Sequence, residues 1–205
     1  TSENTVTITP KALSLSATKV YDGSNTLSGN QITMTGLVGT QTLNYTGATL
    51  SDINVATANK YISAITLTDG TNGGIASNYL APTLTSAYTY NNAAVTPRVV
   101  TLSASKTYDA TATLSGSQVT INTGVGSETL NYSGATANNV NVATAGKFIN
   151  AITLADGSGG GVASNYALPT LNATTAPVTI IKAALTVTAN DATMIYGANV
   201  LPSFS

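Results

Sequence analysis

The chain has 205 residues, of which 7% are charged and 42% are hydrophobic, and its formal net charge is −1. It contains no cysteine, histidine or tryptophan, which excludes disulfide frameworks, Cys/His metal sites and Ser-His-Asp or Cys-His catalytic groups. Its 7 scattered cations do not make the basic surface of a nucleic-acid-binding protein. No apolar stretch of about 18 residues is present, so we expect no membrane insertion.

The uncharged polar residues are mainly Thr, Ser, Asn and Gly, which favour strands and turns, and helix formers other than Ala are scarce. We therefore predict an all-β protein with a composition of extracellular type. Alternating apolar and polar residues predict strands at 12–17, 31–35, 42–46, 60–67 and 83–96, the last of them bent or broken. Turn residues gather at 22–25, 36–39 and 69–74.

Short strands separated by frequent turns are typical of a small β-sandwich of the immunoglobulin-like type. The alternative is a β-grasp fold, which needs one helix. Only residues 51–59 offer a candidate for that helix.

The chain is a tandem repeat with an offset of 87 residues, which aligns Pro10 with Pro97. Roughly 44 of about 75 positions that follow these prolines are identical. The opening motif begins a third time at Lys182, and the first residues resemble the end of a repeat, so we expect a fragment of a longer array. We predict the tail of a preceding repeat at 1–9, complete repeats at 10–96 and 97–181, and the truncated start of a third unit at 182–205.

The two complete repeats meet at Val95-Thr96-Pro97-Arg98, where no Gly/Ser-rich linker separates them. Proline restricts its own backbone and pushes the preceding residue toward extended geometry. The last strand of one repeat should therefore run almost directly into the first strand of the next. We predict that neighbouring repeats are each other's partners in a semi-rigid rod of end-to-end domains.

Short motifs of the first repeat stand at Lys19-Val20-Tyr21-Asp22-Gly23, Asn54-Val55, Ser77-Asn78-Tyr79 and Thr96-Pro97. Together they resemble the YDG repeat domain, a family found in very large secreted bacterial adhesins of the filamentous-haemagglutinin type. Residues 182–205, with Tyr196-Gly197, are similar to the opening of an MBG module from the same kind of adhesin. The second repeat departs from the family pattern, because Ala110 stands where the glycine of the YDG motif belongs.

The resemblance implies an extracellular or cell-surface protein that a partner transporter exports by two-partner secretion, with roles in cell adhesion and biofilm. Because the chain is repetitive, stiffly joined and without catalytic groups, we predict a structural stalk that projects a binding region from the cell. The alternative is a weak, multivalent module that binds an extracellular polysaccharide or a protein of a host surface. We expect no enzymatic activity.

The two copies of the repeat allow an internal comparison of candidate site residues. Gln41 aligns with Glu128 and Asp52 with Asn139, so we infer that neither carboxylate is required in both repeats. The ionisable residues that both repeats keep are the pairs Lys19/Lys106, Asp22/Asp109, Lys60/Lys147 and Asp69/Asp156.

The repeated aspartates have two candidate roles. An aspartate that precedes a turn commonly forms an Asx-turn or accepts hydrogen bonds from backbone N–H groups. The alternative is a calcium site, although calcium takes about six to eight oxygens and each loop offers one carboxylate. Calcium is the only cofactor we consider, and its candidate ligands are Asp22, Asp69, Asp109 and Asp156.

The repeated lysines also have two candidate roles. The usual one is a solvated ammonium with the alkyl stem lying on the sheet. The alternative is an amide cross-link to an asparagine, promoted by a buried acid, which requires a desolvated lysine. The candidates are Lys19, Lys60, Lys106 and Lys147.

Tyr79 and Tyr166 follow Asn78 and Asn165, and this pattern predicts a tyrosine corner whose hydroxyl bonds to a neighbouring loop. We predict that the other repeated tyrosines are core aromatics with the hydroxyl in water. Those tyrosines are Tyr21, Tyr45, Tyr108 and Tyr132. The alternative role for all of these aromatic side chains is contact with a glycan, because sugar rings stack on aromatic rings.

Overall fold

The computed structural model describes residues 4–188, 193 and 195–197. The predicted third unit at 182–205, with its MBG-like motif, lies partly outside these described residues. The described chain is all-β, and its helical segments are four 3-10 turns. Among the residues described, no helix is long and apolar enough to cross a membrane.

The strands form two sets, which we call unit 1 and unit 2. Unit 1 contains β1 (Lys11–Ala12), β2 (Ser14–Val20), β3 (Ile32–Thr35), β4 (Leu43–Leu50), β5 (Ile62–Asp69), β6 (Tyr79–Leu80) and β7 (Asn91–Thr96), with the 3-10 turns η1 (Gly29–Gln31) and η2 (Ala76–Asn78). Unit 2 contains β8 (Arg98–Val99), β9 (Thr101–Thr107), β10 (Val119–Asn122), β11 (Leu130–Ala137), β12 (Ile149–Asp156), β13 (Tyr166–Ala167) and β14 (Val178–Ile181), with η3 (Gly116–Gln118) and η4 (Ala163–Asn165).

Each unit is a small β-sandwich with the same sheet topology. Unit 1 has a three-stranded sheet β3-β2-β7, a two-stranded sheet β4-β5 and a short pair β1-β6. Unit 2 repeats this arrangement as β10-β9-β14, β11-β12 and β8-β13. All pairings in these sheets join strands of the same unit. The prediction of tandem β-sandwich domains is therefore confirmed.

Apolar side chains from both sheets of unit 1 fill its core. Leu15 and Ala17 alternate with exposed or half-buried residues along β2, as expected for a strand with one buried face. Ile62 of β5 is 0% exposed and packs in the same core cluster. Full burial of such an aliphatic side chain stabilises the fold by about 1.5–3 kcal/mol.

Two of the parallel pairings decide which residues lie at the ends of a unit. Since β2 and β7 are parallel, both end at the same pole, where the backbone N–H of Tyr21 donates to Thr96 O at 2.9 Å. The chain then passes through Pro97 into unit 2. At the opposite pole β6 pairs in parallel with β1, which places Tyr79 beside Lys11. Tyr21 therefore lies at the exit of its unit and Tyr79 at the entrance.

The bend or break predicted within 83–96 is present, whereas the helix considered at 51–59 for the alternative fold is not. The strand predicted at 83–96 is confined to β7, because the segment before it bends and closes a turn in which Tyr88 and Asn91 exchange backbone hydrogen bonds. Residues 51–59 form turns and bends, and the backbone N–H of Thr57 donates to Asn54 O. The helix that a β-grasp fold would need is therefore not formed there.

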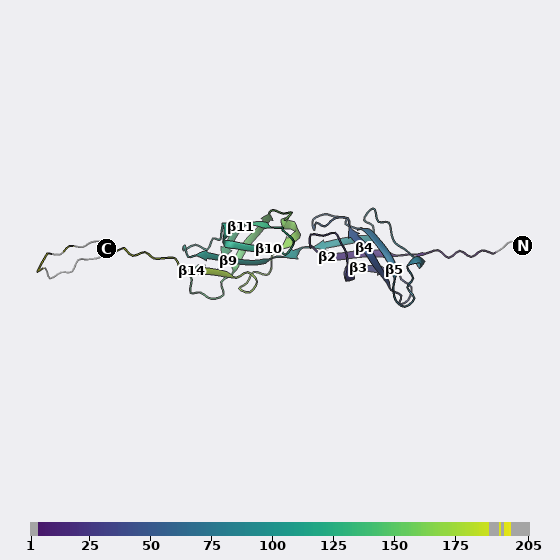
Figure 1. Cartoon of the computed structure of the whole chain (residues 1–205), viewed down its shortest axis with the longest axis horizontal. Helices are drawn as coiled ribbons and strands as arrows, with labels where there is room; N and C mark the ends of the chain where they lie inside the picture. The colour runs from purple at the N-terminus through teal and green to yellow at the C-terminus, as the bar shows by residue number, and fades with distance from the viewer. Residues whose placement is uncertain (1–3, 189–192, 194, 198–205) are drawn as a thin grey trace.

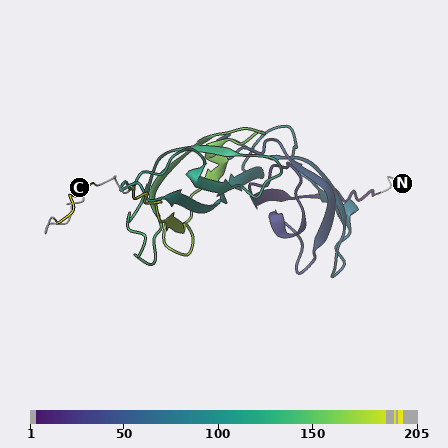
Figure 2. The same cartoon turned by 60° about the vertical axis from the view of Figure 1, so that its left-hand side comes forward.

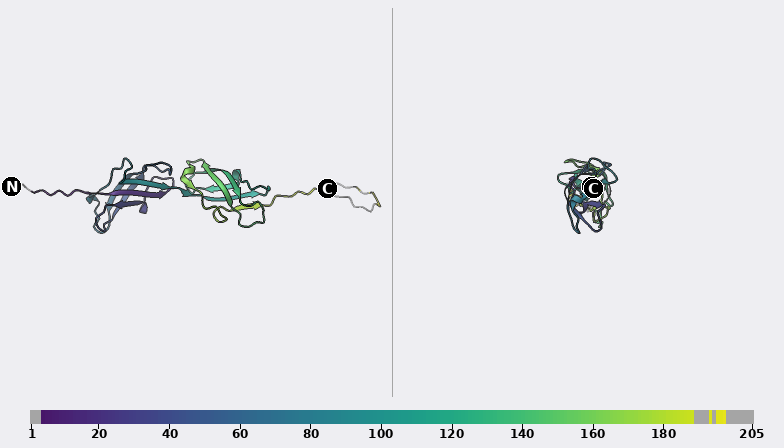
Figure 3. Two further views of the ribbon diagram at one scale, coloured as in Figure 1. Left: turned by 180° about the vertical axis from the view of Figure 1, so that it is seen from behind. Right: turned by 90° about the vertical axis from the view of Figure 1, so that its right-hand side faces the viewer.

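The two units lie end to end along the long axis, with the labelled strands of unit 2 on the left and those of unit 1 on the right (Figure 1). Viewed along the long axis, both units fall within one narrow outline (Figure 3). In an oblique view they form a shallow arch (Figure 2). The molecule is therefore elongated, and the exit of unit 1 faces the entrance of unit 2.

Candidate functional site

The candidate site is the junction between the units. On the side of unit 1 the junction is formed by four residues that we call its exit face: Tyr21, Gly23, Asn54 and Val55. On the side of unit 2 it is formed by four residues that we call its entrance face: Val125, Glu128, Asn165 and Tyr166. Side chains of these two faces contact each other through hydrogen bonds and apolar packing.

Glu128 joins the two units through both of its carboxylate oxygens. Tyr21 of unit 1 donates its hydroxyl to Glu128 Oε1 at 2.8 Å, and Tyr166 of unit 2 donates to Glu128 Oε2 at 2.6 Å. The two tyrosine rings meet edge to face, with centroids 5.4 Å apart and an interplanar angle of 77°. Hydrogen bonds to an ionised acceptor are roughly twice as strong as neutral ones. One carboxylate thus orients an aromatic side chain from each unit.

The environment of this cluster changes the acidity of both hydroxyls. Burial, and then the hydrogen bond and negative charge of Glu128, raise the pKa of Tyr21 from 10.0 to about 12. The same causes raise the pKa of Tyr166. Both tyrosines are therefore neutral donors over the whole physiological pH range.

Asn165 makes the second polar connection between the units. The backbone N–H of Val55 donates to Asn165 Oδ1 at 2.8 Å, and Asn165 Nδ2 donates to Asn54 Oδ1 at 2.9 Å. Asn165 is 0% exposed. A buried amide is stable only when its donors and acceptors are satisfied, so separation of the units would leave these groups to be solvated or unpaired.

The repeated lysines shape the exit face. Lys19 Nζ donates to Ser24 O at 3.0 Å and Thr26 O at 2.8 Å, and it forms an ion pair with Asp22 Oδ1 at 2.8 Å. Lys19 thereby holds the loop that carries Gly23. Its ammonium is buried, so the prediction of a solvated ammonium is wrong for this residue.

Lys60 holds the other loop of the exit face. Its Nζ donates to Val55 O at 3.1 Å and also to Thr57 O, which fixes the turn that presents Asn54 and Val55. Lys60 is buried as well, and the expectation of a solvated ammonium is wrong here too. Buried ammonium groups need several oxygen partners, and closely spaced backbone carbonyls supply them.

Unit 2 places its lysines in the same way. Lys106 Nζ donates to Thr111 O at 3.1 Å and Thr113 O at 2.8 Å and forms an ion pair with Asp109 at 2.7 Å. Lys147 Nζ donates to Val142 O at 3.0 Å. Lys106 is buried and Lys147 is half-buried. The prediction that their ammonium groups extend into solvent is therefore wrong.

Asp22 and Asp109 form Asx-turns in addition to their ion pairs. Asp22 Oδ1 accepts the backbone N–H of Ser24 at 2.9 Å, and Asp109 Oδ1 accepts that of Thr111 at 3.0 Å. The hydrogen bond from Lys106 lowers the pKa of Asp109 from 3.8 to about 2. Burial acts to raise the pKa of Asp22, but the hydrogen bonds from Lys19 and Ser24 outweigh it and lower the pKa.

Asp69 and Asp156 belong to the entrance side of each unit. Asp69 Oδ1 accepts the backbone N–H of Ala76 at 2.8 Å, and Asp156 Oδ1 accepts that of Ala163 at 2.8 Å. These bonds fix the 3-10 turns η2 and η4. The turn η4 presents Asn165, the residue that bonds to unit 1. All four repeated pairs of charges therefore support the loops of an entrance or an exit face.

The structure does not gather the candidate calcium ligands or cross-linking partners. Within the described ranges, no group of three or more His, Cys, Asp or Glu residues could hold a metal ion. Each repeated aspartate bonds to its own loop, as given above. The hydrogen bonds found for the four lysines in the described part of the chain go to carbonyl, hydroxyl and aspartate oxygens, and none goes to an asparagine side chain.

Tyr79 lies at the entrance of unit 1, the pole away from the junction. Its hydroxyl accepts the backbone N–H of Val38 at 3.1 Å and donates to Gln41 Oε1, so it bonds to a neighbouring loop. The preceding Asn78 is exposed, whereas its counterpart Asn165 is buried at the junction. Tyr108, the counterpart of Tyr21, is 38% exposed at the exit of unit 2.

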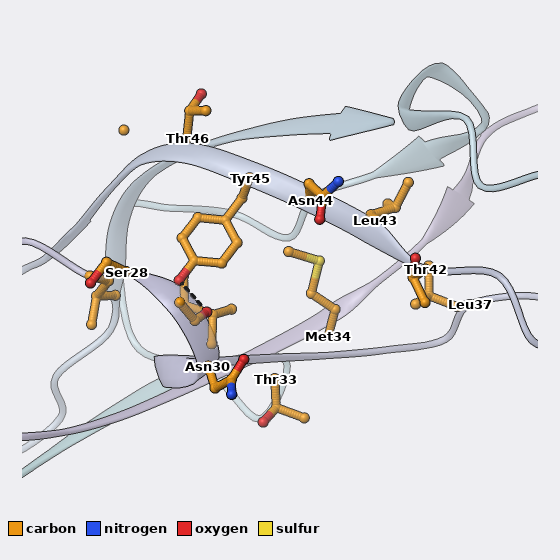
Figure 4. A pocket seen from close by; sticks show the side chains of 14 residues that line it. Ser28, Asn30, Thr33, Met34, Leu37, Thr42, Leu43, Asn44, Tyr45 and Thr46 are labelled. Atoms are coloured by element: carbon orange, nitrogen blue, oxygen red, sulfur yellow. Dashed lines mark hydrogen bonds between the residues drawn. The ribbon is translucent and has the colours of Figure 1, made fainter. Parts of the chain in front are cut away.

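Tyr45 and Tyr132 each line a groove of their unit. In unit 1 an open groove of about 870 Å³ lies between β3 and β4, and Tyr45 reaches across it to donate its hydroxyl to Gly29 O at 2.9 Å (Figure 4). Unit 2 has a groove of about 710 Å³, in which Tyr132 donates to Gly116 O at 2.8 Å. Both tyrosines are half-buried and have a pKa raised by burial. Each unit therefore presents its tyrosine in an open groove, although β3 lines the groove of unit 1 and no residue of β10 lines that of unit 2.

Glu128, the central residue of the junction, is not among the site residues predicted from the sequence. We set it aside because Gln41 stands at the same place in unit 1. Tyr79 bonds to Gln41 as Tyr166 bonds to Glu128, but a carboxylate has a second acceptor oxygen that receives Tyr21 from the neighbouring unit. The change from an amide at Gln41 to an acid at Glu128 was the signal in the sequence that could have indicated this role. It suggests instead, when the two copies alone are compared, that the carboxylate is dispensable.

Comparison with known proteins supports the resemblance for the first unit. The YDG domain family model matches residues 4–87. The second unit is related to this segment by the internal identity of the repeat. No curated protein and no solved structure is significantly similar to the chain. The prediction of a YDG-type repeat is thus confirmed for residues 4–87.

Proposed function

We propose that the chain is a rigid spacer segment of a bacterial surface or biofilm-matrix adhesin, and that it projects a binding region away from the cell. The observation that carries this proposal is the junction in which Glu128 binds tyrosines from both units while Asn165 bonds to the backbone of unit 1. Such a contact resists bending between units, because bending would break charge-assisted and buried hydrogen bonds. The partners in this role are the neighbouring repeats of the same chain.

The cellular setting belongs to the same proposal. The similarity of residues 4–87 to the YDG domain, and a composition whose polar residues are mainly Thr, Ser, Asn and Gly with few charges, support an extracellular location. Adhesins of the filamentous-haemagglutinin type, with export by two-partner secretion and MBG modules beside the YDG modules, are the context that the resemblance suggests. We propose no enzymatic activity, because the repeated carboxylates are engaged in holding loops.

The rigidity of the rod can be measured with two spin labels. The chain has no cysteine, so Asn30→Cys and Ser117→Cys place one label at an equivalent exposed position in each unit. We expect double electron–electron resonance to give one narrow distance distribution. As a comparison, Glu128→Ala combined with Asn165→Ala should broaden it. A broad distribution in the otherwise native chain would refute the spacer proposal.

The grooves favour a second candidate function, which is weak multivalent binding of an extracellular polysaccharide or a host surface protein. Tyr45 with Asn44 in unit 1 and Tyr132 with Asn131 in unit 2 occupy equivalent positions in the grooves, and an array multiplies a weak affinity. A glycan array probed with the full chain tests this function. Binding that is lost in Tyr45→Ala with Tyr132→Ala would support it, and no binding at millimolar glycan concentration would count against it.

A further inference from the structure

The end of unit 2 that lies away from unit 1 repeats the exit face of unit 1. Tyr108, Asn141 and Val142 stand at the positions of Tyr21, Asn54 and Val55. There, Tyr108, Asn141 and the residues that follow line an open hollow of about 580 Å³. Tyr21 is 2% exposed in contact with unit 2, whereas Tyr108 is 38% exposed. The surface that is covered at the junction is therefore open at this end.

This second exit face is held in place in the same way as the first. Lys106 binds the carbonyls of Thr111 and Thr113, and Lys147 binds the carbonyl of Val142. Because these internal contacts match those of Lys19 and Lys60 in unit 1, the face has the form of the surface on which unit 1 docks unit 2. Preorganised loops lower the entropic cost of binding.

One residue differs where the contact is tightest. Gly23 lies against unit 2, and a Cβ atom added to it would be 2.7 Å from Val125 Cγ1 and 3.4 Å from Glu128 Oε1. Real Cβ atoms essentially never approach another carbon this closely. Val125 is buried, and a β-branched side chain has little rotamer freedom, so it cannot easily move away. Unit 1 therefore needs a glycine here in order to accept unit 2.

Unit 2 has Ala110 at the position of Gly23. Ala110 has a φ of +63°, a left-handed conformation that favours glycine, so its backbone follows the same path as Gly23 with a φ of +77°. By the equivalence of the two loops, its methyl group stands where an added Cβ on Gly23 would meet Val125. The exit face of unit 2 therefore matches that of unit 1 except for this additional atom.

We propose that the exit face of unit 2 docks a following β-unit of the same polypeptide whose residue at the position of Val125 is smaller than valine. The residue after Tyr-Asp and the residue that faces it from the next unit then form a size-matched pair that determines which unit can follow which. This inference rests on the proposed spacer function and adds an order of units to it. The occupant is argued from continuity with the existing junction, which presents the same loops and lysine contacts.

The size match can be tested at the existing junction with the two spin labels. Gly23→Ala should abolish the narrow distance distribution. Gly29→Ala is the matched control, because Gly29 also has a positive φ of 57° but nothing lies within 4 Å of an added Cβ. Val125→Ala should restore the narrow distribution in the Gly23→Ala chain. An equal effect of the two glycine substitutions, or no rescue, would overturn the size-matched pair.

The exit face of unit 2 is tested in a lengthened chain that carries a second copy of residues 97–181 directly after Ile181. Labels at Ser117→Cys and at the same residue of the added copy report whether that copy docks. With Ala110 retained we expect a broad distribution, and Ala110→Gly or Val125→Ala in the added copy should each make it narrow. If all three distributions are broad, the face does not dock a unit. If all three distance distributions are narrow, Ala110 does not determine which unit can follow unit 2.

These outcomes can be separated from failure of the spacer proposal. A broad distribution in the native two-unit chain would refute the spacer itself. The alternative is a narrow distribution in the native two-unit chain together with a contrary result in the Gly23→Ala experiment or in the lengthened chain. That combination would refute only the selection of the following unit.

Discussion

At the scale of single residues, the junction depends on a difference between two nearly identical copies. Gln41 and Glu128 both accept a tyrosine hydroxyl of their own unit. Only the carboxylate also accepts Tyr21 from the other unit. Glu128 can hold a tyrosine of each unit because a carboxylate has two acceptor oxygens, whereas an amide has a single acceptor oxygen.

Glu128→Gln should lower the pKa of Tyr21 from about 12 toward its ordinary value of 10.0. A raised pKa means that Tyr21 supports the junction while it is neutral, so this contribution is complete below about pH 10 and is lost as the pH rises through about 12. Absorbance of tyrosinate during an alkaline titration measures the shift.

The matched control for this prediction is Gln41→Glu at the entrance of unit 1, away from the junction. It makes the same chemical exchange in the opposite direction. It should leave the titration of Tyr21 unchanged. Equal tyrosine titration in the native and Glu128→Gln chains would contradict the assigned role of Glu128.

At the scale of the elements, the two units differ where their last strands begin. In unit 2 the backbone N–H of Ile149 donates to Ala176 O at 2.9 Å. In unit 1 the equivalent N–H, that of Ile62, donates to a side chain and not to a backbone carbonyl: the acceptor is Asn91 Oδ1. Asn91 Nδ2 donates in turn to Ile62 O and Thr83 O. An amide side chain thus extends the sheet and ties the preceding loop to it.

Asn91→Ala should destabilise unit 1 by about 2–4 kcal/mol, because it leaves several buried backbone groups without partners. Urea denaturation of the full chain measures the change. Asn92→Ala is the control, since Asn92 is exposed and makes one long contact of 3.5 Å with Thr89 O. A loss of stability no greater than that of the control would contradict this role for Asn91.

Several strands were predictable from sequence because their pattern is local. Alternation of Leu15 and Ala17 with polar residues indicated β2, and the alternation around Leu43 and Tyr45 indicated the start of β4. A bend or break within 83–96 was predictable, but its place was not, because it depends on Asn91, whose amide donates to Thr83 O from across the loop. Local propensity gave way there to a tertiary hydrogen bond.

At the scale of the whole molecule, the parallel pairing of β2 and β7 makes the units stack. It brings the end of β7 beside Tyr21, so that the chain leaves unit 1 through Pro97 at the centre of the exit face. The covalent connection and the noncovalent contacts therefore coincide. A linker at this position would allow hinge motion, whereas a strand that continues directly into the next unit restricts it.

Asn165→Ala should weaken the coupling between the units, so that they unfold at separate urea concentrations. The physical reason is the loss of the hydrogen bonds to Val55 N and Asn54 Oδ1. Unfolding followed by two optical probes, or by NMR signals from each unit, measures the separation. Asn78→Ala makes the same change on the exposed entrance of unit 1 and should leave the transitions unchanged. Equal effects of the two substitutions would argue against coupling through Asn165.

The amino-acid sequence by itself determined the repeat, the all-β class and the direct connection at Pro97, because identity at a constant offset, alternation and the lack of a linker are properties of neighbouring residues. Only the tertiary structure decided what the repeated residues do. Tyr21 meets Glu128 across 107 residues of chain, and Val55 meets Asn165 across 110. Such contacts depend on how two folded units face each other, and no local pattern encodes that orientation.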